Sequence, residues 1–468
     1  MVVRRTKIVA TLGPATDPDG VVDALVAAGM DCARLNCSHG TADELRRRAG
    51  EVRAAAKRAG RSVGLLFDLQ GPKLRLSADT PTRMLQPGEK VVFTGLEAAV
   101  GHNRVRVDFP DFPRLVTERS EIVIGDGVPR LAVDSVGPGE VVARAVSVGE
   151  LAPRKGINVT YARPELPAIT DKDEADLALA AELGADFIAL SFVRSAADIE
   201  ELQARLAAHD WHGRVIAKIE KVEAYENLAE IVAVADGVMV ARGDYGVEAG
   251  VARVPLMQKE TIRRATQAGK MVITATQMLE SMIHSPEPTR AEATDVANAV
   301  IDGTSAVMLS AETSVGEYPV DAVRAMSQLA EAGEEFPDIH GARSVHEDTP
   351  AEAVMHAAVE LAENIDAVAL IVPTTLGGSP RACAKYRGRR PIIALPHDQE
   401  IADQLTLEWG VYPRTMPVGA TVDDLVESAL VTAKEFAGLP TGARVVITAG
   451  RQTGASGGTS LIMVREIP

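Results

Sequence analysis

Residues 214–244 read RVIAKIEKVEAYENLAEIVAVADGVMVARGD, and this stretch contains the pattern that decides the fold. Two runs rich in Val, Ile and Ala, at 214–220 and 237–244, flank a stretch rich in Ala, Leu and Glu. A strand, a helix and a second strand in series predict a βαβ unit, in which the two strands are parallel. Both runs end in charged residues, so polar side chains are expected where the strands end.

The same alternation repeats along the chain. Short β-branched or apolar runs alternate with helical patterns, several of which end in Gly, as helix C-termini often do. The eight candidate strands are TKIVATLG (6–13), DCARLNCS (31–38), SVGLLFDLQ (62–70), DFIALSFV (186–193), RVIAKIE (214–220), GVMVARGD (237–244), KMVITATQML (270–279) and SAVMLSAET (305–313). Eight such units in series predict a (β/α)₈ TIM barrel.

Two segments do not follow this alternation of strands and helices. Residues 71–167 are rich in Val, Gly and Pro and contain short strand patterns at close spacing, which predicts an all-β domain inserted as a lid over the barrel mouth. The segment at 334–350 predicts a linker, after which α/β alternation resumes. We therefore expect an α/β protein with a catalytic barrel of residues 1–70 and 168–335, an inserted β-barrel lid domain of 71–167 and a C-terminal α/β regulatory domain of 336–468.

The composition limits the classes of function. The chain has 468 residues, 46% hydrophobic and 24% charged, which is typical of a soluble protein with more than one domain. Its net charge of −16 argues against nucleic-acid partners and anionic membranes. The start lacks a signal-peptide core, no apolar run reaches about 18 residues, and the three cysteines lack metal-ligand spacing. We expect a cytoplasmic protein with no membrane or nucleic-acid partner.

Polar residues two positions apart lie near the ends of five predicted strands. Residues at this spacing share one face of a strand, so they are expected to converge at the mouth of the barrel, where this fold places its active sites. They are Arg34, Asn36 and Ser38; Asp68 and Gln70; Lys218 and Glu220; Arg242 and Asp244; Thr274 and Thr276. The alternative is that each strand end simply meets water.

Glu220 and Asp244 end consecutive strands and are candidates for a metal site. Two carboxylates with few other ligands suit Mg²⁺ or Mn²⁺, which keep positions open for substrate oxygens. Zn²⁺ is disfavoured because no His or Cys accompanies them. The alternative is an ion pair of Lys218 with Glu220 or Asp244 inside the barrel, an arrangement that is costly to bury.

The stretch ARLNCSHGT (33–41) supplies further candidates. Arg34 suits recognition of phosphate or carboxylate. The oxygens of Asn36 and Ser38 could bind a monovalent cation or cap a helix, and for His39 hydrogen bonding at a helix start is favoured over catalysis. Thr276 is a substrate-binding group or a local cap.

Nine motifs together resemble the pyruvate kinase family. TKIVATLGPAT, GMDCARLNCSHGT, DLQGPKLR, KGIN, AKIEK, ARGDYGVE, ATQMLESM, PTRAEATDVANAVIDGTSAVMLSAET and GEYP occur in the family's order and cover nearly the whole chain. The resemblance implies a barrel, a lid and a C-terminal regulatory domain, in a bacterial-like, K⁺-independent member without an extra C-terminal domain. It also implies transfer of phosphate from phosphoenolpyruvate to ADP, giving pyruvate and ATP.

The resemblance also implies residue roles. Lys218 would stabilise the transferring phosphoryl group, with Mg²⁺ or Mn²⁺ held by Glu220 and Asp244. The other implied contacts are Arg34 with the phosphate; Gly243, Asp244 and Thr276 with the substrate carboxylate; Arg75, Lys155, Asn36 and His39 with the nucleotide; and Asn36, Ser38, Asp68 and the Leu69 carbonyl at the family's K⁺ site.

Lys73 distinguishes this chain from family members that need K⁺. Those members usually have Thr and Lys where Leu69 and Gln70 stand, Glu at Lys73 and Thr at Leu76. An ε-ammonium is a compact unit charge that can replace a monovalent cation, so K⁺ is not expected to be required. The alternative is a solvated hinge lysine.

The C-terminal domain contains a loop, PTTLGGSPRA (373–382), that leads into a predicted helix. Loop amides and a helix N-terminus can bind an anion, and the resemblance places a sugar-phosphate or AMP effector at Thr374, Thr375, Gly377, Gly378 and Ser379. A second loop at 449–460 could fold over it. The alternative is an ordinary αβ loop, and the effector's identity stays open.

Two other functions compete with the kinase. One is a Mg²⁺-dependent aldolase or lyase of pyruvate-type acids, because related barrels also hold an enolate with a Glu/Asp pair. The other is a non-catalytic metabolite sensor, which the intact Lys218, Glu220, Asp244 and Thr276 argue against. The family resemblance further implies a homotetramer.

Overall fold

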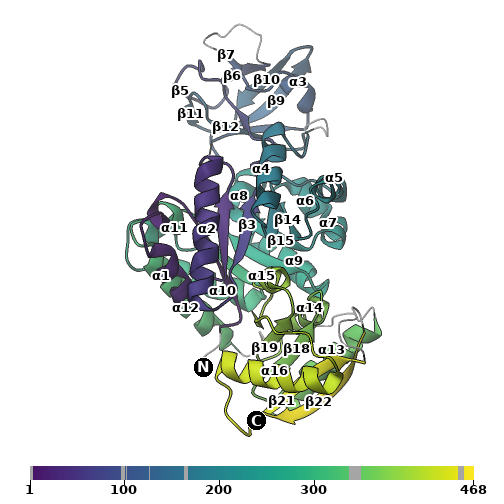
Figure 1. The fold of residues 1–468 in the computed structure, drawn as a ribbon. Helices are drawn as coiled ribbons and strands as arrows, with labels where there is room; N and C mark the ends of the chain where they lie inside the picture. The colour runs from purple at the N-terminus through teal and green to yellow at the C-terminus, as the bar shows by residue number, and fades with distance from the viewer. Residues whose placement is uncertain are drawn as a thin grey trace.

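The computed structural model describes residues 4–95, 101, 103–125, 127–162, 167–336, 349–451 and 458–468. Three units follow one another along its length (Figure 1): a β-rich unit at the top, a barrel in the middle and an α/β unit at the bottom. Most of the predicted linker at 334–350 lies outside the described residues. Across the described residues, each helix is too short or too polar to span a lipid bilayer.

The barrel confirms the predicted (β/α)₈ architecture. Its strands close in the order β1-β17-β16-β15-β14-β13-β3-β2, and the pairings within it are parallel. The strands are β1 (Lys7–Thr11), β2 (Cys32–Asn36), β3 (Gly64–Asp68), β13 (Phe187–Leu190), β14 (Arg214–Ile219), β15 (Gly237–Ala241), β16 (Met271–Ala275) and β17 (Ala306–Leu309). Each strand ends one or more residues before the end of the sequence run that predicted it. Several candidate residues therefore follow a strand instead of belonging to it.

Helices surround the barrel and begin where the sequence offers caps. Thr41 and Glu44 form a capping box at the start of α2, and Gly60 ends that helix in the left-handed conformation. The helical segments of this unit are η1 (Pro14–Thr16), α1 (Val21–Ala28), α2 (Ala42–Ala59), α4 (Asp171–Glu182), α5 (Ala196–Ala208), α6 (Val222–Glu226), α7 (Leu228–Val234), α8 (Arg242–Ala249), η2 (Val251–Arg253), α9 (Val254–Gln267), η3 (Glu280–Ile283), α10 (Arg290–Asp302), α11 (Ala311–Ser314) and α12 (Pro319–Glu334).

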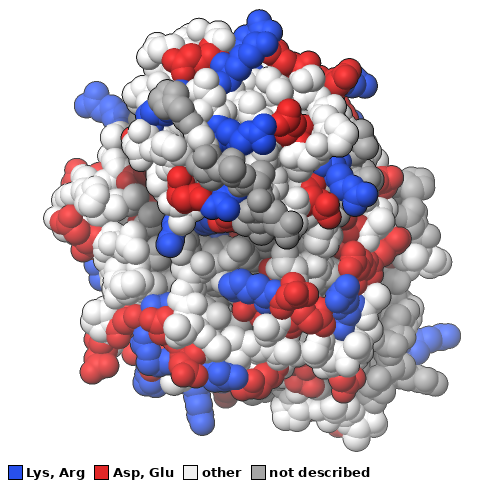
Figure 2. Space-filling view, turned by 90° about the horizontal axis from the view of Figure 1, so that it is seen from above, with Lys and Arg blue, Asp and Glu red and all other residues white. Residues whose placement is uncertain are grey.

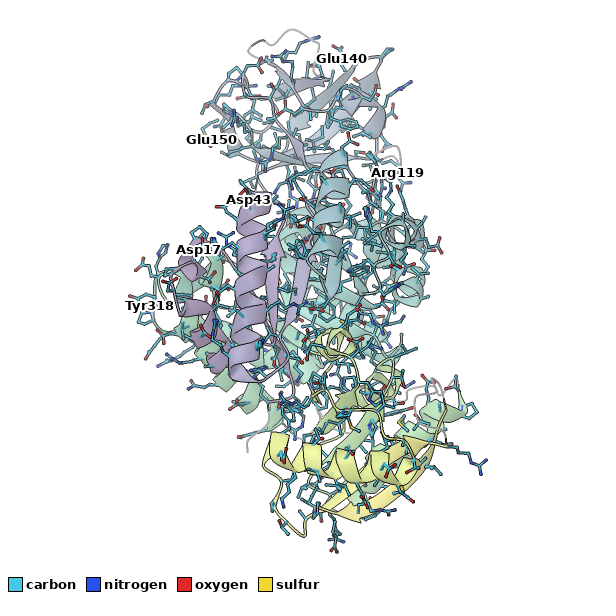
Figure 3. The ribbon with its side chains drawn as sticks, in the orientation of Figure 1. Asp17, Asp43, Arg119, Glu140, Glu150 and Tyr318 are labelled. Atoms are coloured by element: carbon cyan, nitrogen blue, oxygen red, sulfur yellow. The ribbon has the colours of Figure 1, made fainter. Side chains whose placement is uncertain are left out.

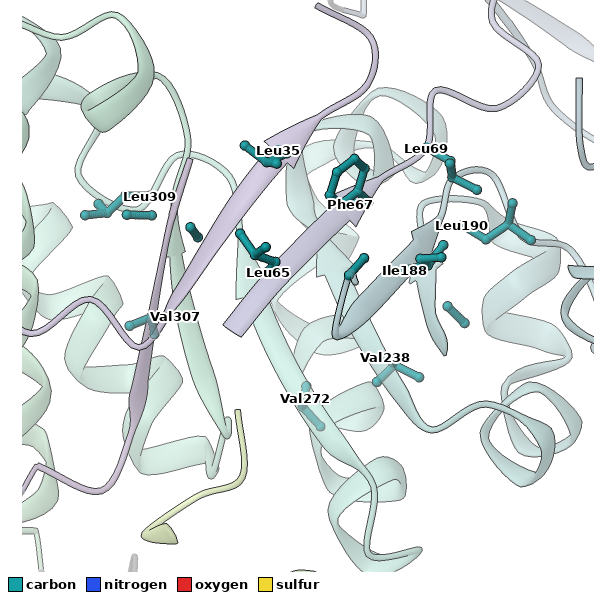
Figure 4. Close-up of a cluster of buried hydrophobic side chains, with 14 of the residues drawn as sticks. Leu35, Leu65, Phe67, Leu69, Ile188, Leu190, Val238, Val272, Val307 and Leu309 are labelled. Carbon is teal, nitrogen blue, oxygen red and sulfur yellow. The ribbon is translucent and has the colours of Figure 1, made fainter. Parts of the chain in front are cut away.

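Side chains of the barrel strands alternate between two layers. Outward-facing residues such as Leu35, Phe67 and Val272 pack in the apolar layer between strands and helices (Figure 4). Inward-facing residues such as Leu66 and Ile216 fill the barrel itself. The alternation therefore sets which residue near each strand end faces the mouth.

The prediction of which polar residues near the strand ends face into the barrel is correct for three strands and wrong for two. Arg34, Asp68 and Lys218 follow inward-facing apolar residues two positions earlier in β2, β3 and β14. In β15 and β16, however, the inward residues include Met239 and Ile273. Arg242 and Thr274 are thus out of phase, and the buried Thr274 Oγ1 donates to Thr304 Oγ1 at 2.9 Å. Asp244 and Thr276 do not lie on strands either, because β15 ends at Ala241 and β16 at Ala275.

The inserted unit is built on strands, as predicted, and adds one short helix, α3 (Phe112–Leu115). A seven-stranded sheet has the order β4-β12-β8-β9-β10-β6-β7, and β11 pairs with β5. The strands are β4 (Leu74–Arg75), β5 (Arg83–Leu85), β6 (Lys90–Thr94), β7 (Arg104–Arg106), β8 (Glu121–Ile124), β9 (Arg130–Gly137), β10 (Glu140–Ala145), β11 (Gly149–Leu151) and β12 (Gly156–Val159). Its entry and exit meet at the barrel, where the Gly71 amide donates to Asp173 Oδ1 at 3.0 Å.

The C-terminal unit is the predicted α/β domain. Its sheet has the order β20-β19-β18-β21-β22, with β22 antiparallel at one edge. The elements are α13 (Pro350–Asn364), β18 (Leu370–Thr374), α14 (Gly378–Ala384), β19 (Ile392–Pro396), α15 (Gln399–Gln404), β20 (Val411–Pro413), α16 (Val422–Ala437), β21 (Arg444–Gly450) and β22 (Thr459–Glu466). It covers the amino-terminal end of the barrel, where Lys7 Nζ donates to the Val411 carbonyl at 2.6 Å.

Candidate active site at the barrel mouth

Lys218 lies at the centre of a buried cluster of charges. Its Nζ is 3.1 Å from Asp68 Oδ1 and 2.9 Å from Glu220 Oε1, and it donates to Ser191 Oγ at 2.7 Å. The Lys218, Asp68 and Glu220 residues are each at most 8% exposed. Burial alone would lower the pKa of Lys218, but the two carboxylates raise it above its ordinary value. The ammonium therefore stays charged across the physiological range.

Arg34 contributes the second cation. Its Nε donates to Asp68 Oδ2 at 2.7 Å and its Nη1 to Thr11 Oγ1 at 3.0 Å. Burial raises the pKa of Asp68, but Lys218 and Arg34 outweigh burial and hold that pKa below its ordinary value. Two cations and two carboxylates thus face one another at the end of β2, β3 and β14.

Glu220 and Asp244 provide two carboxylates for a hard cation. Glu220 Oε2 accepts a hydrogen bond from the Phe192 amide at 2.8 Å. Burial, together with the negative charge of Asp244, raises the pKa of Glu220 even though Lys218 lowers it. Asp244 is exposed at the start of α8. Two carboxylates at one place suit Mg²⁺ or Mn²⁺, which take further oxygens from substrates. Among the described residues no group of three or more His, Cys, Asp or Glu side chains is arranged to hold a metal ion.

Thr276 and Gly243 meet beside this cluster. The Gly243 amide donates to Thr276 Oγ1 at 2.8 Å, and that hydroxyl donates to the Ala275 carbonyl at 2.7 Å. Thr276 and Gln277 both have positive φ, 67° and 54°, a conformation that is uncommon for residues other than glycine. The Thr276 hydroxyl therefore contacts the first turn of α8, 33 residues away in the sequence, and is not a local helix cap.

Arg242 holds this turn in place. Its guanidinium donates to the carbonyls of Ala275, Thr276 and Gln277, and its Nη1 lies 2.6 Å from Asp295 Oδ2. The sequence prediction placed Arg242 on an inward strand face. The structure instead uses it to connect the start of α8 to the end of β16.

The expected K⁺-site residues lie together, with an additional partner. Asn36 Oδ1 accepts from the Ser38 amide at 3.1 Å in the turn after β2. Thr41 caps the following helix, so Asn36 does not take the helix-cap role that the sequence left open. Ser191 Oγ donates to the Leu69 carbonyl at 2.7 Å while accepting from Lys218. Sequence reasoning missed Ser191, because a serine after a strand carries no distinguishing signal. The Asp68 of this group already contacts Arg34 and Lys218.

Two of the four expected nucleotide-binding residues, Arg75 and Lys155, lie in the lid unit. Arg75 Nη1 donates to the Arg154 carbonyl at 3.1 Å, and Lys155 Nζ lies 2.9 Å from Glu150 Oε2; Glu150 is at the lower edge of the lid in Figure 3. The His39 side chain is exposed, and its amide donates to the Asn36 carbonyl at 3.1 Å. Asn36, by contrast, lies opposite Asp68 in the register of β2 and β3, beside the central charge cluster.

A cavity of about 210 Å³ lies between lid and barrel. Lys73, Arg75 and Asp244 are among its lining residues, and the Lys73 side chain is exposed. Over the described residues, Lys73 forms no ion pair with Asp68. Seen from the lid side, positive and negative side chains of the described residues are interspersed (Figure 2), so anion binding would depend on local cations.

The expected effector loop borders a larger cavity of about 560 Å³ in the C-terminal unit. Thr374, Thr375, Gly378 and Ser379 line it, and Ser379 Oγ lies 2.8 Å from Thr459 Oγ1. Gly377 has φ of 76°, and its amide donates to Thr374 Oγ1 at 3.0 Å. The middle of the second loop, 452–457, lies outside the described residues. Ala268 and Gly269 of the barrel unit also line this cavity.

Comparison with known proteins points to one family over the whole chain. Residues 3–323 match the family described as "Pyruvate kinase, barrel domain", and residues 352–465 match "Pyruvate kinase, alpha/beta domain". The chain is 43% identical over 472 residues to the pyruvate kinase of Geobacillus stearothermophilus, covering 99% of this chain and 80% of that one. It is 42% identical over 466 residues to that of Mycobacterium tuberculosis (strain ATCC 25618 / H37Rv), covering 99% and 98%. A crystal structure of a pyruvate kinase from Cryptosporidium parvum superposes with a TM-score of 0.93 at 33% identity, covering 99% of this chain and 96% of that one.

Proposed function

The chain belongs to the pyruvate kinase family, and from this premise we propose which of its residues perform the reaction and how it is regulated. The protein is a phosphotransferase of glycolysis that transfers the phosphoryl group of phosphoenolpyruvate to ADP, giving pyruvate and ATP. Phosphoryl transfer requires positioning and charge neutralisation more than covalent chemistry. The buried cluster at the barrel mouth is the observation that carries the residue assignments.

Lys218 and Arg34 would bind the phosphoryl group. Both are nearly buried cations at the mouth of the barrel, and both contact Asp68. Because Asp68 and Glu220 keep Lys218 protonated, its ammonium is available to stabilise the equatorial oxygens of the transferring group. Arg34 would hold a phosphate oxygen from the neighbouring side. Thr276 would lie beside the reacting carbon atoms.

Glu220 and Asp244 would hold the divalent cation that the family generally uses. A bound Mg²⁺ or Mn²⁺ neutralises negative charge on the enolate and phosphate oxygens. The raised pKa of Glu220 is caused by burial and by Asp244, so a cation at this place would favour the ionised form of both carboxylates. Gly243, Asp244 and Thr276 would orient the carboxylate end of the substrate.

The nucleotide would bind between barrel and lid. Arg75 and Lys155 come from the two connections of the lid, and Arg75 lines the cavity there. They would contact the phosphates of ADP, with Asn36 and His39 on the barrel side. Closure of the lid over both substrates would exclude water that otherwise hydrolyses the phosphoryl group.

Catalysis would not require K⁺. In this chain Leu69, Gln70, Lys73 and Leu76 differ from the residues of K⁺-requiring members. The charge of Lys73 lies at the lid cavity that Asp244 also lines. Arg34 and Lys218 already balance Asp68 in the expected ion site, which leaves less negative charge there for a monovalent cation.

The C-terminal domain would regulate the barrel by binding a sugar phosphate or AMP at the 374–379 loop. The cavity at that loop is lined by residues of both units. Beside it, the buried Arg387 Nη2 donates to the Gly303 carbonyl at 3.0 Å and to Ser305 Oγ at 3.1 Å in the barrel. These bonds give an effector a direct structural connection to the base of β17.

The proposed functional units follow the boundaries expected from the sequence. Residues 1–70 and 168–335 would form the catalytic barrel, 71–167 the lid and 336–468 the regulatory domain, since β3 ends at Asp68, α4 begins at Asp171 and α12 ends at Glu334. We also propose that the protein works in the cytoplasm as a homotetramer.

One assay tests this proposal. Pyruvate formation from phosphoenolpyruvate is followed with Mg²⁺, with and without ADP, in K⁺ or in tetramethylammonium salt, and with each candidate effector. We expect pyruvate only when ADP is present, equal rates in both salts, and activation by one phosphorylated effector. In a parallel incubation with a longer 2-oxo acid and no ADP, formation of pyruvate would indicate a lyase. Turnover of phosphoenolpyruvate no faster than the uncatalysed rate would indicate a sensor.

A further inference from the structure

Three polar side chains, two of them buried, join the lid to the barrel. Lys221 Nζ donates to Asn158 Oδ1 at 3.2 Å, to the Val159 carbonyl at 3.3 Å and to Glu248 Oε2 at 3.2 Å. Asn158 Nδ2 in turn donates to Glu248 Oε2 at 3.2 Å. Lys221, Asn158 and Glu248, here called the hinge triad, therefore contact one another in all three pairs.

The burial of the ion pair between Lys221 and Glu248 calls for an explanation. Lys221 is 6% exposed and Glu248 4% exposed. A buried ion pair usually contributes no more to stability than apolar side chains of the same size would, because both charges lose their hydration. Its hydrogen bonds, however, fix the positions of the partners much more narrowly than apolar contacts do. The triad is therefore better suited to determine geometry than to add stability.

Each member of the triad lies next to a part of the proposed site. Lys221 directly follows Glu220, and Glu248 lies one helical turn after Asp244 in α8. Asn158 belongs to β12, the strand by which the chain leaves the lid, three residues after Lys155. The triad thus connects the two segments that carry the metal carboxylates with the lid connection that carries a nucleotide contact.

A second lid contact reaches the same helix. Arg130 of β9 donates to the Val247 carbonyl in α8 and to Glu121 Oε2 in the lid. Lid side chains thus contact two consecutive residues near the end of α8, while Asp244 lies in its first turn. A displacement of the lid would therefore be transmitted to the helix that carries Asp244.

We propose that Lys221, Asn158 and Glu248 are positioning residues, which set the spacing of Glu220 and Asp244 and couple that spacing to the position of the lid. The inference rests on the metal site proposed above. Without the contacts of the triad, the distance between the carboxylates of Glu220 and Asp244 would vary with lid motion.

The test compares a variant that breaks the triad, a variant that preserves part of it, and a matched control outside it. Lys221→Met removes the ammonium while keeping an unbranched side chain of similar length, and Glu248→Gln keeps an oxygen that accepts from Asn158. Lys90→Met is the control, because Lys90 is a lid lysine whose ion pair with Asp134, 3.3 Å long, is exposed. Mn²⁺ binding is measured by electron paramagnetic resonance without substrates, and amide hydrogen exchange is measured in residues 156–159.

We expect Lys221→Met to weaken Mn²⁺ binding at least tenfold, to speed exchange in β12 at least tenfold, and to lower kcat more than it raises KM for phosphoenolpyruvate. Glu248→Gln should lose less than threefold in Mn²⁺ affinity, and Lys90→Met should match the unaltered protein. If Lys221→Met does not fold, the pair Lys221→Met and Glu248→Leu removes both charges and is measured instead.

Mn²⁺ affinity and exchange in the folded Lys221 variant within twofold of the unaltered protein would overturn the inference. A weakening of Mn²⁺ binding that is equally large in Lys90→Met would also overturn it. Failure of the proposed metal site is recognised separately, because the unaltered protein itself would then bind no Mn²⁺, and the inference would fall with it.

Discussion

Lys218 Nζ and Asp68 Oδ1 lie 3.1 Å apart although their strands, β14 and β3, are not neighbours in the barrel. Strand β13 lies between them, and the contact passes across the barrel mouth. This arrangement is possible because both side chains occupy inward positions at the ends of their strands. The active-site charges are therefore held by the closure of the barrel and not by one local motif.

Replacing Lys218 by Met is expected to lower kcat by about 10²–10³-fold, because it removes a preorganised positive charge facing the phosphoryl oxygens. The KM for ADP should change little, since Arg75 and Lys155 are on the lid side. Steady-state kinetics, with circular dichroism to verify folding, measure the effect. A kcat within threefold of the unaltered value would contradict the role assigned to Lys218.

Replacing Glu220 by Gln should weaken binding of Mg²⁺ and Mn²⁺ by roughly 100-fold, because losses of 10–100-fold follow even when a residue that only supports a ligand is removed. Activity should recover in part at high metal concentration. Titration with Mn²⁺ followed by electron paramagnetic resonance gives the affinity directly. Glu226→Gln, an exposed residue six positions along the chain, serves as the nearby control and should bind metal normally.

The unaltered protein is expected to work equally well in K⁺ and in tetramethylammonium salt, whereas Lys73→Glu should require K⁺. The substitution removes a positive charge and adds a negative one beside the lid cavity, so a monovalent cation would then be needed to restore the balance. We expect K⁺ to raise the rate of the variant at least about tenfold, which is ~1.4 kcal/mol in activation free energy. Strong K⁺ activation of the unaltered protein would disprove this prediction.

Lys7 should make stability depend on pH. Burial lowers its pKa to about 8, and the nearby Asp31 offsets this only in part. Between pH 8 and its ordinary value of 10.5 the unfolded chain binds more protons at this residue than the folded protein does. Stability from Lys7 must therefore rise with pH across that window, by an amount on the order of 3 kcal/mol.

Chemical denaturation of the protein and of Lys7→Met at pH 7.5, 9 and 10.5 checks this prediction. The unaltered protein should gain stability relative to Lys7→Met as the pH rises, and taking the difference removes the contributions of other groups. A difference that stays constant over these pH values would show that the ammonium of Lys7 is not perturbed by its burial.

The sequence predicted the barrel and the inward residues of β2, β3 and β14. In β16 it chose the wrong alternation, because apolar residues such as Ile273 face inward there and Thr274 does not. Asp68 and Lys218 follow the alternation of an extended chain, so their direction could be deduced. Asp244 and Thr276 could not be placed in this way, because α8 begins at Arg242 and the chain turns through positive φ at Thr276. Both departures depend on tertiary contacts, above all those of Arg242 with three carbonyls.

The hinge triad was beyond the reach of sequence reasoning for a different reason. Lys221 and Glu248 are 27 residues apart in the sequence, and Asn158 is farther from both. Each is a polar residue type that is common on protein surfaces, so none of them stands out in the sequence. Only the folded chain shows that they contact one another, and that Lys221 and Glu248 are buried there. Lys73 illustrates the converse: its sequence context suggested proximity to Asp68, while the structure places its side chain at the exposed edge of the lid cavity.

The hydrogen bond between the Gly71 amide and Asp173 brings the two ends of the inserted domain together. An insertion whose ends adjoin can be excised and its place closed by a short turn without stretching the host. The barrel and the lid are in this sense modular, and the barrel strands form their own closed sheet and core without the lid. A lidless chain is thus a realistic engineering target, in which phosphoryl transfer to water could be compared with transfer to a nucleotide on the same scaffold.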